Sequence, residues 1–153
     1  MPPPPVLLDL VPGLGLGPLR LGALRAENRD AIVAVLGPGC LAGSGGAVDR
    51  FCDGAIEIEY GEDDRCDFVG VGSHAAFRVV FDGLDVFGTV GRSLFARMAA
   101  REPDPSRHRY SADQYVFPTT GLTVWGAGST VYAQVGVGSA RYLEELETIR
   151  SGG

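Results

Sequence analysis

Short segments in which apolar and polar residues alternate follow one another along most of the chain. In residues 55–60, apolar side chains alternate with Glu57 and Glu59, which predicts a half-buried strand with the two glutamates on its outer side. The acidic stretch 61–64 then predicts a turn, and the apolar run 66–71 predicts the returning strand. This part of the chain is therefore expected to form a hairpin with an acidic tip.

A second hairpin is predicted across residues 77–87. Its centre is Asp82-Gly83, a residue pair that favours a type I′ turn between antiparallel strands. Other apolar runs bounded by glycine, proline or polar residues predict further strands at 7–11, 19–21, 115–117, 122–125 and 131–137. Loops are expected at 37–46 and 104–113.

Three segments have apolar residues at helical spacing. The first helix is expected at 24–36 and is ended by Gly37-Pro38. The second follows Thr89, a candidate N-cap, and the third follows Ser139, a candidate N-cap of a short C-terminal helix. The residues at helical spacing in the first are Leu24, Asn28, Ala31, Ile32, Val35 and Leu36. In the second, Val90, Leu94, Phe95 and Met98 are expected to face inward, and in the third, Tyr142, Leu143, Leu146 and Ile149 share one face.

These elements predict an α+β fold. We expect a largely antiparallel sheet with two helices packed on one face, a concave opposite face and a short C-terminal helix. A chain of 153 residues with 45% hydrophobic residues is sufficient for one core, so residues 6–150 are expected to form a single domain. The proline tract 1–5 is expected to be a flexible arm, and 151–153 a frayed tail.

A sequence motif occurs twice, as Gly83-Leu-Asp-Val-Phe-Gly88 and as Gly121-Leu-Thr-Val-Trp-Gly126. It suggests a strand, helix and hairpin unit in tandem. With Leu21-Gly22, Val35-Leu36-Gly37 and the strand 56–60, the chain resembles uncharacterised bacterial proteins that are distantly similar to phagosome assembly factor repeats. The tandem unit is also similar to the modules of beta-lactamase inhibitor proteins, and this resemblance implies binding of a protein partner on a concave sheet, without catalysis.

Charge and composition restrict the partner and the setting. The net charge of −6 disfavours nucleic acid and is complementary to a basic protein. All 13 basic residues are arginines, as expected from GC-rich codons and a bacterium such as an actinomycete. The odd number of cysteines, Cys40, Cys52 and Cys66, suggests a reducing cytoplasm, and the apolar run 6–10 is too short for export or for crossing a membrane.

Motifs for nucleotides and metals do not fit the chain. The glycine-rich segment 13–17 lacks the spacing of a dinucleotide fingerprint, and a P-loop needs a lysine. The cysteines and His74 are too widely spaced for a zinc motif, and the acidic segment 62–67 lacks the ligand spacing of a calcium loop. We therefore expect no cofactor and no metal.

Three functions remain. The first is a non-enzymatic protein-binding module with an immunity or antitoxin-like role against a basic partner. Among the aromatic residues, Phe117 and Trp125 are expected in the core and Tyr110 at an interface. The expected partner-binding residues are Glu57, Glu59, Glu62, Asp63, Asp64, Asp67 and Tyr110. The second function is small-molecule or lipid binding in a cavity between helices and sheet, lined by Phe77, Phe81, Phe87, Phe95 and Trp125. The third, an enzyme, requires His74 or His108 beside a carboxylate in a cleft.

Overall fold

The computed structural model describes residues 4–127 and 130–152, with side chains through residue 148. Residues 1–3 of the predicted proline arm, Gly153 of the predicted tail and the side chain of Ile149 lie outside these ranges. Pro4 and Pro5 are exposed.

The smaller of two sheets contains five strands in the order β3-β2-β1-β8-β9. The strands are β1 (Val6–Val11), β2 (Gly15–Leu16), β3 (Leu19–Arg20), β8 (Phe77–Phe81) and β9 (Leu84–Asp85). β1 and β8 are parallel, and the other neighbours are antiparallel. Asp82 and Gly83 between β8 and β9 have φ of 49° and 80°, as a type I′ turn requires, so this predicted turn is confirmed.

The larger sheet contains seven antiparallel strands in the order β10-β11-β12-β7-β6-β5-β4. The strands are β4 (Leu41–Gly45), β5 (Val48–Phe51), β6 (Ile56–Tyr60), β7 (Cys66–Gly72), β10 (Gln114–Val116), β11 (Leu122–Trp125) and β12 (Gln134–Gly138). Short 3₁₀ turns are η1 (Pro38–Cys40), η2 (Val86–Gly88) and η3 (Pro105–Arg107).

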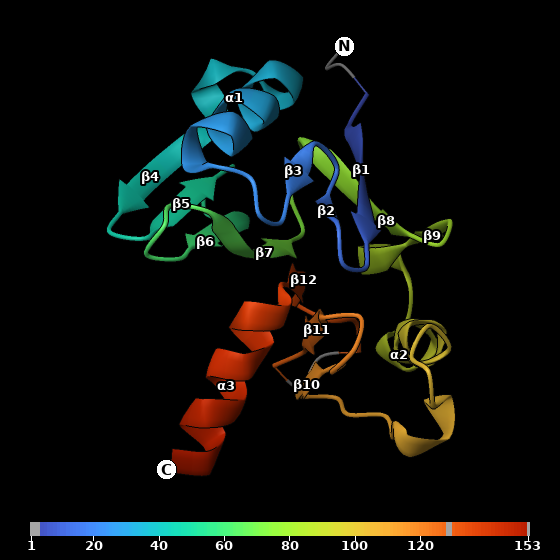
Figure 1. Cartoon of the computed structure of the whole chain (residues 1–153). Helices are drawn as coiled ribbons and strands as arrows, with labels where there is room; N and C mark the ends of the chain where they lie inside the picture. Colours follow the sequence, from blue (N-terminus) through green and yellow to red (C-terminus); the bar gives the residue numbers. More distant parts are fainter. Residues whose placement is uncertain (1–3, 128–129, 153) are drawn as a thin grey trace.

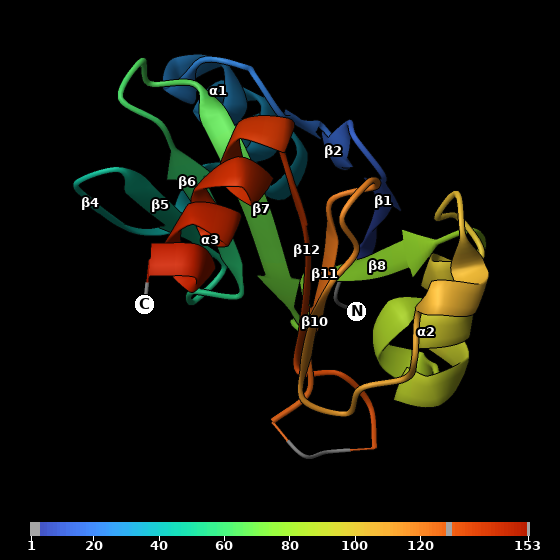
Figure 2. The same cartoon turned by 60° about the horizontal axis from the view of Figure 1, so that its bottom comes forward.

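Two helices cover one face of the larger sheet, and a third lies on the opposite face. The helices are α1 (Arg25–Leu36), α2 (Gly91–Ala99) and α3 (Ala140–Gly152). α1 and α3 lie on opposite sides of the sheet (Figure 1), and α2 and α3 lie on opposite sides of β10, β11 and β12 (Figure 2). A single core joins the inner faces of both sheets to α1 and α2, with Phe51, Phe81 and Phe117 fully buried. We call the face toward α1 and α2 the inner face and the other the outer face.

The α+β class, the largely antiparallel strands and the short C-terminal helix are confirmed. The strands divide between two sheets, where the sequence predicts one. The chain order is also a tandem arrangement, because β1, α1 and the strands β4–β7 are followed by β8, α2 and the strands β10–β12. The halves meet at two seams, the β1–β8 pair and the β7–β12 pair. Both copies of the sequence motif fall in the second half, so they do not mark this repeat.

Two local predictions are wrong. The segment 37–46 contains β4, which is held to the sheet by a hairpin with β5, whereas the sequence predicts a loop. Thr89 does not cap α2, because its hydroxyl donates to the carbonyl of Asp85 at 2.7 Å. The N-cap at Ser139 is confirmed, since its hydroxyl accepts a hydrogen bond from the amide of Tyr142 at 3.2 Å. None of the helices in the described residues has the length and apolar composition that crossing a membrane requires.

Candidate functional site

Two glycines, Gly70 and Gly136, lie side by side on the outer face of the larger sheet. Strand pairing places Glu57, Gly70, Gly136 and Thr123 in one row across four strands. A Cβ atom on Gly70 would lie 2.5 Å from Nε2 of Gln134, and one on Gly136 would lie 2.6 Å from the ring of Phe68. Glycine at these two positions therefore leaves room for the larger side chains that line this face.

Helix α3 is attached to this face at its first turn. Nη2 of Arg141 lies 2.9 Å from Oδ1 of Asp67 and 3.0 Å from Oδ1 of Asp63. The ring of Tyr142 stacks on Phe68 with 4.7 Å between centroids. Gly61 makes room for the guanidinium, because a Cβ there would lie 2.2 Å from Nη2 of Arg141. The rest of the helix leaves a hollow on each side.

The first hollow, which we call the sheet groove, has a volume of about 380 Å³ and lies over the outer face. Strand pairing places Trp125 between Gln114 and Gln134 at one end, and Trp125 is 48% exposed. Glu57 and Glu59 form the other end. The groove is lined by Glu57, Glu59, Phe68, Gln114, Val116, Thr123, Val124, Trp125, Gln134, Tyr142 and Leu146.

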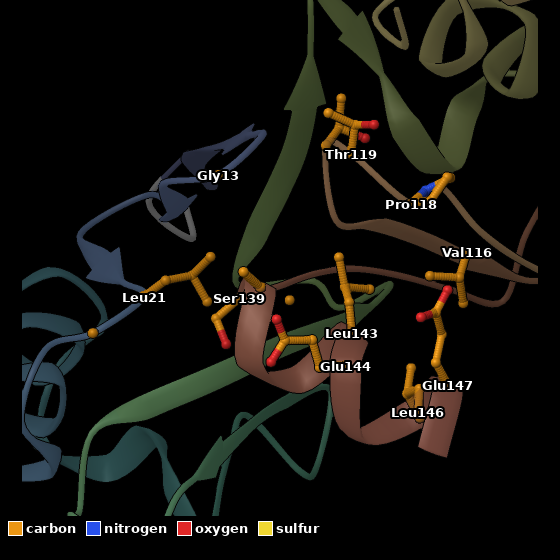
Figure 3. Close-up of a pocket in the computed structure, with 14 residues that line it drawn as sticks. Gly13, Leu21, Val116, Pro118, Thr119, Ser139, Leu143, Glu144, Leu146 and Glu147 are labelled. Atoms are coloured by element: carbon orange, nitrogen blue, oxygen red, sulfur yellow. The ribbon is translucent and has the colours of Figure 1, made fainter. Parts of the chain in front are cut away.

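The second hollow, which we call the helix pocket, has a volume of about 660 Å³. Its walls come from the N-terminal loops, from the β10–β11 connection and from α3 (Figure 3). It is lined by Gly13, Leu21, Gly22, Val116, Pro118, Thr119, Thr120, Gly138, Ser139, Ala140, Leu143, Glu144, Leu146 and Glu147. Val116 and Leu146 line both hollows.

The sheet groove contains a half-buried carboxylate under electrostatic strain. Burial, and then the carboxylates of Glu57 and Asp67, raise the pKa of Glu59 above its ordinary value. Within residues 4–127 and 130–148, no hydrogen bond or ion pair joins this carboxylate to another side chain. Burial, followed by Glu59 and Glu57, also raises the pKa of Tyr142 to about 12. A cation in the groove would relieve this strain.

The predicted acidic residues have different surroundings. Glu57 and Glu59 lie on the outer face, as predicted, and Glu57 is 3.8 Å from Arg50. Asp63 and Asp67 are paired with Arg141, and Asp67 is buried. The two other turn residues, Glu62 and Asp64, are exposed, and Oδ1 of Asp64 lies 3.9 Å from Arg25. The hairpin tip thus attaches α1 and α3 to the sheet.

Of the two aromatic residues predicted in the core, one is buried and one is exposed. Trp125, predicted in the core, is exposed in the sheet groove, whereas Phe117 is fully buried as predicted. Tyr110, predicted at an interface, is half-buried, with its ring edge-on to Phe95 and Arg92 stacked over it at 4.2 Å. The aromatic cavity is not formed, because Phe77, Phe81 and Phe95 are buried in the core, Phe87 packs against it and Trp125 lies on the outer face.

Both histidines lie beside a carboxylate. Nε2 of His74 is 2.8 Å from the exposed Asp53, and Nε2 of His108 is 3.9 Å from the buried Glu102. Nδ1 of His108 also bonds the hydroxyl of Tyr115. Neither histidine lines the sheet groove or the helix pocket. The enzyme alternative requires such a histidine and carboxylate pair in a cleft, but neither pair lies in the sheet groove or in the helix pocket.

Glu102 holds the β10–β11 connection. Its Oε1 accepts hydrogen bonds from the amides of Thr119 and Thr120 and from the hydroxyl of Thr120, at 3.1, 2.8 and 2.9 Å. Burial opposes ionisation, but these hydrogen bonds outweigh it and lower the pKa of Glu102. One wall of the helix pocket is therefore fixed by a buried carboxylate.

The described residues contain no group of three or more histidine, cysteine, aspartate or glutamate side chains that could hold a metal ion. All three cysteines are buried as free thiols. Burial raises the pKa of Cys52 to about 11 and that of Cys66 to about 12. Because the thiolate is the reactive form, these residues are poor nucleophiles.

Sequence reasoning missed most of the groove and the pocket. Gln114, Gln134 and Thr123 are ordinary polar residues that become neighbours only through pairing of three strands. One signal was present, since the inward Leu122 and Val124 place Trp125 outward by the two-residue period of a strand. Comparisons with protein-family models, curated proteins and solved structures find no match to this chain.

Proposed function

We propose that this chain is a non-enzymatic binding module that holds a basic segment of a protein partner in the sheet groove. The supporting observation is Glu59, a half-buried carboxylate that has two acidic neighbours and no ion-pair partner among the described residues. An arginine or lysine of the partner would supply the missing positive charge. If this partner is a basic toxin, the chain would have an immunity or antitoxin-like role.

The groove offers distinct contacts to such a side chain. A guanidinium would donate charge-assisted hydrogen bonds to Glu57 and Glu59, and the exposed indole of Trp125 offers a face for a second cation. Gln114 and Gln134 beside Trp125 carry amide groups that can bond a peptide backbone. The net charge of −6 would speed the encounter with a basic protein.

Fluorescence titration with a hexa-arginine peptide tests this proposal, because Trp125 is the one tryptophan of the chain. We expect binding that weakens with salt and a change in tryptophan emission. The double variant E57Q/E59Q should weaken binding by about tenfold to a hundredfold, since each lost charge-assisted hydrogen bond costs about 1.5–3 kcal/mol and some of that is recovered by glutamine.

E62Q is the matched control, because Glu62 is exposed at the tip of the same hairpin and does not line the groove. Its affinity should equal that of the unmodified chain. Equal affinity of E57Q/E59Q and the unmodified chain would contradict the proposal. A loss confined to E62Q would move the contact to the hairpin tip.

A further inference from the structure

The arginines of this acidic chain are unevenly distributed. Residues 91–110, which run from the start of α2 to Tyr110, contain five arginines and two acidic residues and have a net charge of +3. The rest of the chain contains eight arginines and 17 acidic residues and has a net charge of −9. One region of the protein therefore has a charge opposite to that of all the rest.

Three arginines of this region have no acidic partner. The other two form ion pairs with nearby aspartates. In the part of the chain that the structure describes, no ion pair joins Arg92, Arg97 or Arg109 to a carboxylate. All three residues are exposed. We call these three arginines the basic patch.

The basic patch lies on α2 and on the segment that packs against this helix. Cζ of Arg92 lies 4.2 Å from the centroid of the Tyr110 ring, and Arg109 precedes Tyr110 in the chain. Arg97 lies on the same helix as Arg92, at a rise of about 7.5 Å. The ring of Tyr110 is edge-on to Phe95 of α2, which holds the segment in place. The patch is therefore formed by the folded chain before any partner binds.

The basic patch and the sheet groove lie on opposite sides of the molecule. α2 lies on the inner side of β10, β11 and β12, whereas the groove lies on the outer face beside α3 (Figure 2). The patch of one copy therefore cannot reach the groove of the same copy. A second copy can bring the two surfaces together.

The two surfaces complement each other in charge and in chemistry. Glu57 and Glu59 form one end of the groove, and no described residue forms an ion pair with Glu59. A guanidinium can donate two parallel hydrogen bonds to a carboxylate, and it can also stack on an indole such as that of Trp125. Each surface thus has the charge that the other lacks.

We infer that the sheet groove of one copy binds the basic patch of a second copy, with Arg92 and Arg109 beside Glu57 and Glu59. This inference rests on the proposed function and names the partner. Because the two surfaces face opposite ways, two copies cannot make the contact twice in one dimer. Each contact leaves a free groove and a free patch, so further copies add head to tail.

Sedimentation velocity of the unmodified chain over a range of concentrations tests the inference. We expect the sedimentation coefficient to increase with concentration at low salt and to return to that of the monomer as salt is added. Hexa-arginine should dissociate the assembly, because it occupies the groove. A chain that stays monomeric at every concentration would overturn the inference. If such a monomeric chain still binds hexa-arginine, the proposed function stands without it.

Variants of each surface should weaken the association separately. E57Q/E59Q removes the charges at the acidic end of the groove, and R92Q/R109Q removes two charges of the patch. Each variant should need about a tenfold higher concentration to associate, or more, because charge-assisted hydrogen bonds are lost. Association of either variant at the same concentration as the unmodified chain would overturn the inference.

R65Q/R78Q is the matched control for the patch variant, since it has the same net charge. Arg65 and Arg78 are exposed, lie outside α2 and do not line the groove. The control should associate like the unmodified chain. An equal loss of association in R65Q/R78Q and R92Q/R109Q would show that net charge alone matters, against the inference.

A mixture of the two surface variants is the most specific test. E57Q/E59Q retains an intact patch and R92Q/R109Q an intact groove, so one contact between them remains possible. We expect a 1:1 dimer that does not grow further, and its formation would show that both variants are folded. A mixture that stays monomeric at concentrations where the unmodified chain associates would overturn the inference.

Discussion

The guanidinium of Arg141 lies 2.9 Å from the carboxylate of Asp67 and joins α3 to β7. The same guanidinium reaches Asp63 in the β6–β7 turn at 3.0 Å. Two residues that the sequence presents as solvent-facing acids thus have an intramolecular partner far away in the chain. The position of α3, and with it the shape of both hollows, depends on this contact.

Replacement of Arg141 by alanine should loosen α3 while the rest of the fold is kept. The helix would keep the Tyr142–Phe68 stack but lose its ion pairs with the sheet. We expect amide hydrogen exchange in α3 to become several-fold faster, with little change in β5, β6 and β7. Exchange measured by mass spectrometry checks this.

R107A is the control, because Arg107 forms an exposed ion pair with Asp104 at 3.0 Å in a turn remote from α3. Exchange in α3 should be unchanged in this variant. Unchanged exchange in R141A as well would show that the ion pairs do not hold the helix.

Replacement of Asp49 by alanine should strongly destabilise the protein. The buried carboxylate accepts hydrogen bonds from Arg25, Arg29 and Ser44, at 2.8, 2.7 and 2.8 Å from its Oδ1. The variant removes the buried carboxylate that both arginines share, so we expect a loss of about 2–4 kcal/mol in the free energy of unfolding, measured in urea. D30A, at an exposed position of α1, should lose less than about 0.5 kcal/mol.

Asp49 should also make the fold sensitive to acid. Burial raises its pKa, but hydrogen bonds from Arg29, Arg25 and Ser44 outweigh burial and hold the pKa well below its ordinary value of 3.8. Its contribution is therefore present above that value and is lost as the pH falls further. Denaturation from pH 5 downward should show a steeper loss of stability for the unmodified chain than for D49A, and parallel curves would contradict this.

Replacement of Glu59 by glutamine should stabilise the protein at neutral pH. Because the folded state raises the pKa of Glu59, ionisation of this residue favours the unfolded chain. The protein then loses stability as the pH rises from the ordinary value of 4.5 through the folded pKa. We expect a small increase in Tm for E59Q at pH 7 and none below about pH 4, where both states are protonated.

Calorimetry at the two pH values measures this, with E62Q as the control. A decrease in Tm at pH 7 for E59Q, or an equal increase for E62Q, would count against strain at Glu59. An increase in Tm for E59Q alone would mean that the charge of Glu59 in the groove lowers the stability of the fold. Such a loss of stability is common at binding sites.

Local patterns predicted most strands and helices, because burial on one side of an element repeats at its own period. The strand β6 is an example, since Ile56 and Ile58 face the core and Glu57 and Glu59 the outer side. The β4–β5 hairpin was missed because glycines make β4 look like a loop and because the acidic Asp49 faces inward. The partners of Asp49, Arg25 and Arg29, come from helix α1, so no local pattern reveals the pairing.

The candidate site was only partly predictable, for the same reason. Glu57 and Glu59 were identified from alternation alone. The place of α3 on the outer face is set by Arg141 and Tyr142, whose contacts are more than 70 residues away in the chain. The two hollows beside the helix follow from that placement.

A residue-resolved NMR titration with hexa-arginine tests whether the sheet groove holds a basic segment. We predict that amides of β6 and β11 and the indole of Trp125 shift together, with a single affinity that weakens as salt is added. Shifts limited to the 61–64 turn, or scattered shifts without saturation, would contradict it.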